Sequence, residues 1–381
     1  MTEEIQNLPA TPVSKSLDPR VLSLDQFRGY TMAGMFLVNF IGEFAAIPEI
    51  FKHNNTYCSY ADTIFPHFFF AVGFAYRLAF LKRLKRVESS WPVYRHAIWR
   101  CLGLILIGLI IYHLGGRYRS WEDLRETGVG EVLYRGFRSL PWQALVHIGV
   151  TSLFVLPVIH RSKAVRISFM VASAGLHVFL SHLFYYDWVI ENRSIDGGPL
   201  GFLTYTVPTI VGSLAYDLMT SKGPKRSLSP LLFWGAVLMT MGYAFSCITF
   251  LQLSPEGETG ILSRLANPPF IPPTYPTDMW TMNQQVGSLS YLVFASGFSL
   301  WVYTLFVIVS DLKGFEVGMF RTFGTNALAG YIIHDMVLNA IHPLAPYDSP
   351  LTYIAPAFAL YFGITYFFIR HLEKKNIYFK L

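Results

Sequence analysis

Residues 27–47 read FRGYTMAGMFLVNFIGEFAAI, and this stretch decides the fold class of the chain. It has the length and apolar character of a helix that crosses the hydrocarbon core of a bilayer, which takes about 20 residues. About ten blocks of this kind succeed one another along the 381 residues. The sequence therefore predicts an all-α, polytopic membrane protein with about ten transmembrane helices.

The composition of the chain agrees with this prediction. Hydrophobic residues make up 52% and charged residues only 14%, whereas soluble domains carry roughly 25% charged residues. The predicted spans cover residues 27–47, 63–82, 97–115, 141–159, 164–185, 199–219, 229–251, 287–310, 319–341 and 350–370.

The basic residues orient these spans. Counted over alternate loops, 22 of the 30 lysines and arginines fall on the side that holds both termini. The positive-inside rule places that side in the cytoplasm. We therefore expect a cytoplasmic tail over residues 1–20, a membrane domain over residues 21–381 and an extracytoplasmic, proline-rich loop over residues 252–285. Residues 1–20 lack the apolar core of a signal peptide, and WEDLRETGVGEVLYRGFR (residues 121–138) is expected to include an interfacial helix.

A formal net charge of +6 is compatible with binding to nucleic acid, but the placement of the basic residues argues against such a partner. The basic residues lie in short loops between apolar blocks. The arginine-rich stripe with interspersed aromatic residues that is typical of a nucleic-acid-binding surface does not occur. The three cysteines and the histidines in the spans lack the spacing of metal ligands. We therefore expect neither a nucleic-acid partner nor a metal site.

Polar residues in or beside the spans are the functional candidates, because such groups are costly in a bilayer. In the first span, Asn39 and Glu43 lie four residues apart and share a helix face, which indicates a polar interior. Asp25 and Arg28 stand at the cytoplasmic end of the same span. For them, an interfacial ion pair and a ligand-binding role are both compatible with the sequence.

The loop after the first span holds His53, and Asp62 precedes the second span. A histidine beside a carboxylate can act as a general base toward a hydroxyl or an amine. The spacing alone is also compatible with Asp62 as the cap of the following helix and His53 as an ordinary loop residue.

Several motifs occur together in a fixed order. The chain has VLSLDQFRGYTMAGMFLVNF at residues 21–40, ADTIFPHFFFAVG at 61–73, PWQALVHIGV at 141–150 and FGTNALAGYIIHD at 323–335. In this order they resemble the heparan-α-glucosaminide N-acetyltransferase family, which belongs to a superfamily of transmembrane acyltransferases. The resemblance begins at about residue 21 and covers most of the chain.

The resemblance implies transfer of an acyl group, expected to be acetyl, from cytoplasmic acyl-CoA to a sugar or glycan acceptor across the membrane. Residues 21–381 would then form a transmembrane acyltransferase domain. The family's catalytic histidine matches His53, as general base or acyl carrier, and its active-site asparagine matches Asn39. Asp62, Asn326 and His334 match other recurrent polar positions of the family. The predicted topology places His53 outside, as the reaction requires.

Further roles follow from position in the predicted spans. Arg28, Gly324 and Asn326 are candidates to bind the CoA donor, which we expect as acetyl-CoA or another acyl-CoA. Glu43, Asn283 and His334 are candidates to bind the acceptor. For the ninth span, packing through small residues is the alternative; for Asn283, a solvated loop is the alternative.

We expect a multi-pass protein of the cell membrane. In a Gram-negative organism this would be the inner membrane. The lipid bilayer is a partner, and a homodimer stays open. Two other classes also fit: a secondary transporter or flippase of a small polar or lipid-linked solute, and a non-catalytic partner that kept the fold. Against a transporter, no inverted repeat stands out and the polar groups cluster toward one outer site.

Overall fold

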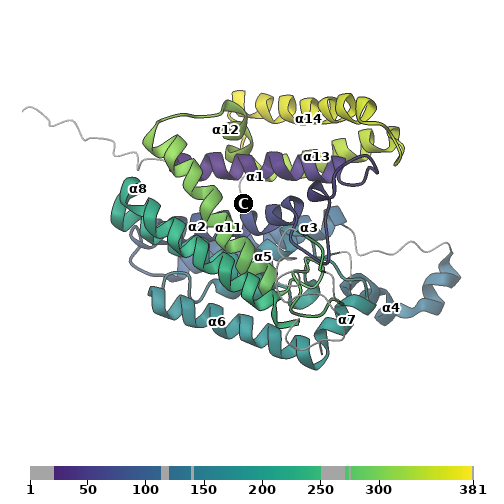
Figure 1. Cartoon of the computed structure of the whole chain (residues 1–381), viewed down its shortest axis with the longest axis horizontal. Helices are drawn as coiled ribbons and strands as arrows, with labels where there is room; N and C mark the ends of the chain where they lie inside the picture. Colours follow the sequence, from purple (N-terminus) through teal and green to yellow (C-terminus); the bar gives the residue numbers. More distant parts are fainter. Residues whose placement is uncertain (1–20, 113–119, 139–140, 250–270, 274–275, 380–381) are drawn as a thin grey trace, which may run out of the picture.

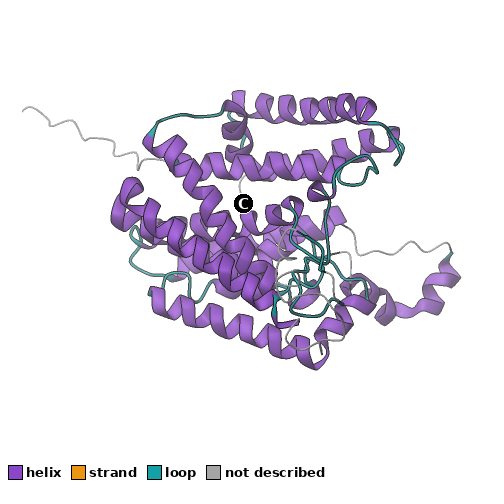
Figure 2. Ribbon diagram, viewed as in Figure 1, coloured by secondary structure: helices purple, strands orange, loops and turns teal. Residues whose placement is uncertain are grey.

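The computed structural model of the chain describes residues 21–112, 120–138, 141–249, 271–273 and 276–379. Every regular element in these ranges is a helix, and no strand occurs among them (Figure 2). The predicted all-α class is confirmed for these residues. The predicted tail, residues 1–20, lies outside the described residues, as does most of the predicted loop 252–285.

Each predicted span overlaps a helix or part of one, and residues 121–138 are helical as expected. The helices are α1 (Leu22–Ile41), α2 (Tyr60–Leu84), α3 (Trp91–Tyr112), α4 (Trp121–Arg138), α5 (Ala144–Val155), α6 (Lys163–Leu180), α7 (Tyr186–Glu191), α8 (Phe202–Ser246), α11 (Leu289–Phe306), α12 (Gly318–Thr325), α13 (Ala327–Ile341) and α14 (Leu351–Lys374).

Six helical segments of the described residues are long and apolar enough to cross a membrane. They are Tyr60–Leu84, Trp91–Tyr112, Lys163–Glu191, Gly198–Ser246, Leu289–Leu312 and Leu351–Lys374.

The difference from ten has physical causes. The 49-residue segment contains two predicted spans, which meet where Gly223 takes a φ of 73°. Helix α5 has only 12 residues, and the ninth predicted span is divided at Asn326 into α12 and α13. In α1, polar side chains such as Gln26 and Asn39 interrupt the apolar sequence. Ten spans and cytoplasmic termini therefore stay predictions.

The helices pack in layers. Helices α1, α13 and α14 lie together on one side, α6 and α7 lie on the opposite side, and α2, α5, α8 and α11 run between them (Figure 1). Part of α4 projects from this bundle. One end of the bundle holds the loops before α2 and α8 and the segment before α11. There the Gly197 amide donates a hydrogen bond to the Gln285 carbonyl oxygen at 2.9 Å.

Glycines permit the closest helix crossings. A Cβ atom on Gly73 of α2 would lie 1.8 Å from the Thr209 carbonyl oxygen, and one on Gly212 of α8 would lie 2.0 Å from the Phe70 carbonyl oxygen. Backbones that approach this closely leave no room for a side chain. These contacts fix α2, which carries part of the functional site, against α8.

Candidate active site

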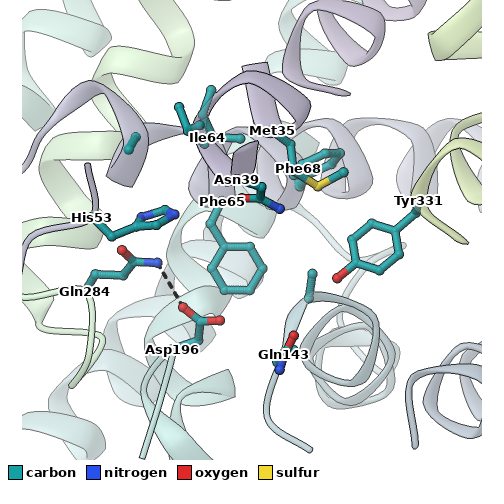
Figure 3. Close-up of a pocket in the computed structure, with 13 residues that line it drawn as sticks. Met35, Asn39, His53, Ile64, Phe65, Phe68, Gln143, Asp196, Gln284 and Tyr331 are labelled. Atoms are coloured by element: carbon teal, nitrogen blue, oxygen red, sulfur yellow. Dashed lines mark hydrogen bonds between the residues drawn. The ribbon is translucent and has the colours of Figure 1, made fainter. Parts of the chain in front are cut away.

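A cavity of about 150 Å³ opens among α1, α2, α5, α13 and the adjoining loops. Its walls combine apolar side chains with six polar ones (Figure 3). We call it the His53 cavity; it is lined by Met35, Val38, Asn39, His53, Ala61, Ile64, Phe65, Phe68, Gln143, Ala144, Asp196, Gln284 and Tyr331.

His53 and Asp62 form a hydrogen-bonded pair at this cavity. The Nδ1 atom of His53 lies 3.0 Å from Oδ1 of Asp62. The Asp62 side chain is 1% exposed, whereas the His53 side chain is 46% exposed. A carboxylate in this position favours the tautomer that carries its proton on Nδ1, which leaves Nε2 free as a proton acceptor. The pair thus has the geometry of an oriented general base.

Asp62 is itself held by the start of α2. Its Oδ2 atom accepts from the backbone amide of Ser59 at 3.0 Å and from the Ser59 hydroxyl at 2.9 Å. The Ser59 hydroxyl oxygen accepts in turn from the Asp62 amide, which completes a capping box. The sequence left open whether Asp62 caps the helix or orients His53, and the structure shows that it does both.

A second carboxylate, Asp196, enters the cavity from the loop between α7 and α8. Its Oδ1 atom accepts from Nε2 of Gln284 at 3.0 Å (Figure 3). Asp196 has a φ of 50° and precedes Gly197 with a φ of 81°, so this turn is a left-handed one that favours glycine and aspartate. Burial raises the pKa of Asp196 to about 6, although Gln284 and His53 both stabilise the carboxylate.

The environment raises the pKa of His53 above 6.5. Burial is the largest influence and lowers this pKa, but the hydrogen bond and negative charge of Asp62, together with the charge of Asp196, outweigh it. The two carboxylates thus favour protonation of His53, and a base with a raised pKa takes up a proton more readily.

Asn39, Gln143 and Tyr331 bring further polar groups to the cavity (Figure 3). Asn39 lies on α1, Gln143 precedes α5 and Tyr331 lies on α13. Within the described part of the chain, none of the three side chains has a hydrogen bond to another residue. These amide and hydroxyl groups are free to bind a ligand.

Other residues selected from the sequence lie outside the cavity lining. The Arg28 guanidinium is 3.8 Å from the Asp25 carboxylate, in the ion-pair arrangement that the sequence allowed. Glu43 has a 78% exposed side chain, 3.6 Å from Nε2 of His342. The Asn283 side chain accepts from the Val286 amide at 3.2 Å, which stabilises a turn, and the neighbouring Gln284 reaches the cavity.

The residues selected in the ninth span also have structural neighbours. A Cβ atom on Gly324 would lie 2.1 Å from the Asp25 carbonyl oxygen, so Gly324 sits in the crossing of α12 with α1. The Asn326 amide donates to the Ile377 carbonyl at 3.0 Å and accepts from the Phe379 amide at 3.1 Å. His334 is buried and stacks on Phe36, with ring centroids 4.9 Å apart.

Sequence reasoning did not single out Asp196, Gln143 or Tyr331. From the amide cluster at residues 283–285 it chose Asn283, whereas Gln284 lines the cavity. Asp196 carried a signal in the Asp-Gly-Gly turn, which is typical of a left-handed backbone. Tyr331 lies one helical turn before His334, within the same motif. Among the described residues, no group of three His, Cys, Asp or Glu side chains is arranged to hold a metal ion.

Comparison with known proteins finds two curated relatives. The chain is 36% identical over 126 residues to the heparan-alpha-glucosaminide N-acetyltransferase of Homo sapiens, which covers 32% of this chain and 18% of that protein. It is 32% identical over 133 residues to the protein of the same name from Mus musculus, covering 32% and 20%. The chain thus matches about a fifth of the length of these relatives. No protein-family model matches. The resemblance that the motifs indicate is confirmed over about a third of the chain, whereas the motifs predicted it over most of the chain.

Proposed function

We propose that this chain is a membrane acetyltransferase that moves an acetyl group from acetyl-CoA to the amine or hydroxyl of a sugar acceptor. Both relatives are named for acetyl transfer to the glucosaminide of heparan, which supports this reaction class. The proposed donor is cytoplasmic and the proposed acceptor extracytoplasmic, as the resemblance implies, and the topology predicted from the basic residues, with His53 outside, supports these sides. The proposed location is the cell membrane.

One observation carries the proposal: His53 pairs with the buried Asp62 at a cavity that also holds Asn39. A general base must reach the proton of the acceptor, and the groups that stabilise the developing oxyanion must reach the carbonyl oxygen. Nε2 of His53 has the first role here. The Asn39 amide and the Tyr331 hydroxyl, which have no partner in the described part of the chain, have the second.

The proposed reaction is a direct transfer. The acceptor nitrogen or oxygen attacks the thioester carbonyl carbon while Nε2 of His53 takes its proton. A carbon–nitrogen or carbon–oxygen bond forms, the carbon–sulfur bond breaks, and the CoA thiolate takes the proton from His53 as it leaves. In the alternative, Nε2 attacks the thioester first and carries the acetyl group to the acceptor.

The function is tested with the purified full chain and radiolabelled acetyl-CoA. We expect acetyl transfer to glucosamine or to a glucosamine-containing glycan, and an increased melting temperature in the presence of CoA. Labelled acetyl on His53 without acceptor would identify the acyl-histidine route. Transport of a solute without any acetyl transfer would favour the transporter interpretation instead.

Asp62→Asn is expected to shift the acid limb of the pH profile. The base acts when it is neutral, so the wild-type kcat/KM should fall as pH decreases through a midpoint above 6.5, which is the ordinary pKa of histidine. The Asp62 charge raises this pKa, and burial opposes it. Removal of the Asp62 charge therefore moves the midpoint to lower pH. The maximal rate also falls, because Nδ1 of His53 loses its orienting carboxylate. Asp348→Asn, at an exposed loop position, should leave the midpoint unchanged. An unchanged midpoint in both variants would contradict the His53–Asp62 assignment.

Asp196→Asn is expected to weaken acceptor binding. A carboxylate that Gln284 holds in the cavity can accept a hydrogen bond from an acceptor hydroxyl or ammonium group. Hydrogen bonds to charged groups contribute about 1.5–3 kcal/mol, so the acceptor KM should rise about 10- to 100-fold. Steady-state kinetics with varied acceptor and saturating donor measure this change, and the KM for acetyl-CoA should change little. Equal increases in both KM values would show that Asp196 acts on the cavity as a whole.

A further inference from the structure

A second cavity lies beside the His53 cavity. It has a volume of about 500 Å³, within the range of about 300–1,000 Å³ that is usual for small-molecule sites. It lies among α3, α4 and α5, and its lining contains no charged residue. We call it the α3–α5 cavity; it is lined by Ile105, Leu109, Leu133, Tyr134, Phe137, Pro141, Trp142, Val146 and Val150.

The two cavities share the start of α5. Gln143 and Ala144 line the His53 cavity, whereas Trp142 and Val146 line the α3–α5 cavity. Phe65, a wall of the His53 cavity, contacts His147 with ring centroids 6.3 Å apart. His147 contacts Trp142 at 5.6 Å. The rings of Phe65, His147 and Trp142 therefore form a partition between the two cavities.

This partition contains an unpaired polar group. His147 is fully buried, and neither of its ring nitrogens has a hydrogen-bond partner within the described part of the chain. Buried polar groups in native proteins are nearly always paired, so an unpaired imidazole requires an explanation. A ligand that passes between the cavities would bring a polar linkage next to it.

The α3–α5 cavity is accessible from the surface, beside the helix α4 that the sequence predicts to lie at the membrane interface. Leu133 and Phe137 of α4 are exposed although they line it. Helix α4 ends against the start of α5, because the Trp142 indole donates to the Phe137 carbonyl. A hydrocarbon chain can therefore enter this cavity from the bilayer while its polar end reaches toward Gln143.

We propose that the acceptor is a sugar that carries a long hydrocarbon chain, with the sugar in the His53 cavity and the chain in the α3–α5 cavity. This inference rests on the proposed acetyl transfer and adds the class of acceptor. The His53 cavity has a volume of only about 150 Å³, so a long hydrocarbon chain on the acceptor needs a separate site. The apolar lining matches a hydrocarbon chain, and the start of α5, which borders both cavities, places that chain next to the reacting sugar.

The kinetic test compares glucosamine with dodecyl glucosaminide, using the full chain in phosphatidylcholine nanodiscs. Because each buried methylene contributes to binding, kcat/KM for the dodecyl acceptor should exceed that for glucosamine by at least about tenfold. Leu109→Trp fills the cavity and should remove most of this advantage without lowering the rate with glucosamine. The neighbouring Ile110→Trp is the control, because Ile110 is 63% exposed and does not line the cavity. Equal kcat/KM values for the two acceptors, or equal effects of the two tryptophan variants, would overturn the proposal.

A second measurement needs no turnover. Dodecyl glucosaminide and phosphatidylcholine, each with a diazirine at the chain end, are photocrosslinked to the protein and the labelled peptides are mapped. The glycoside should label α3, α4 and α5 in excess of the phospholipid, and Leu109→Trp should abolish this labelling. Equal labelling by both probes would mean that ordinary bilayer lipid occupies the cavity, which overturns the proposal. Specific labelling without any acetyl transfer would support the chain site and contradict the proposed reaction.

Discussion

Replacing His53 with alanine is expected to lower kcat/KM for acetyl transfer by about 10²- to 10⁴-fold, the usual contribution of a positioned general acid or base. The variant removes Nε2, the proton acceptor at the cavity, and leaves Asp62 bound to Ser59 at the start of α2. The fold should therefore persist, and the loss should appear mainly in kcat. Initial rates with radiolabelled acetyl-CoA measure the change.

The matched control is His182→Ala. His182 is exposed in the π-helical segment Ser181–Tyr185 between α6 and α7 and does not line the cavity, so its replacement should leave the rate unchanged. CoA binding, followed through the melting temperature, should be similar in the wild type and the His53 variant. Undiminished transfer by His53→Ala would remove His53 from the mechanism.

Gly212→Ala is expected to cause a large loss of stability. A Cβ atom at this position would lie 2.0 Å from the Phe70 carbonyl oxygen, and a backbone atom cannot move aside as the end of a side chain can. Inserting a group into a packed core commonly costs about 1–3 kcal/mol, and this contact places the variant at or above the upper end. Separation of α8 from α2 should also disturb the site. The melting temperature and the yield of monodisperse protein in detergent measure the effect.

Gly363→Ala is the control for helix propensity. Gly363 lies within α14, and a Cβ atom there would have no atom within 4 Å. Alanine is favoured over glycine in a helix by roughly 1 kcal/mol, so this substitution should be neutral or stabilising. The two substitutions are chemically identical and should have effects of opposite sign. Similar melting temperatures for both variants would show that the crossing of α2 with α8 is looser than described.

The sequence predicted the helices well because apolar length and loop composition are local properties. Where the prediction and the structure differ, the cause is non-local or depends on a single backbone angle. Gly223 breaks one long helical segment where two separate spans were expected. Asn326, with φ −127° and ψ 46°, divides α12 from α13, and its side chain bonds to Ile377 and Phe379 more than 50 positions away, which hydropathy does not report. Membrane orientation follows from charge distribution and stays a prediction.

The candidate site was predictable where residues close in the sequence meet. His53 and Asp62 are nine positions apart, and a helix cap joins them. Asp196 and Gln284 are 88 positions apart and meet only because two loops pair at the end of the bundle. Nothing in the local sequence of either residue encodes that contact. The same limitation explains the choice of Asn283: adjacent amides look equivalent until a turn directs one inward and the other toward its own backbone.

The double role of Asp62 has a consequence for how this site is inherited. One carboxylate starts the helix that packs against α8 and also orients the imidazole, so selection for folding alone is expected to retain it. A descendant that had lost His53 and its activity would still keep Asp62. The aspartate is therefore a poor indicator of catalysis among relatives of this chain, and the histidine is the informative position. Distant sequences should be sorted into active and inactive members by the residue in the loop, not by the carboxylate at the start of the helix.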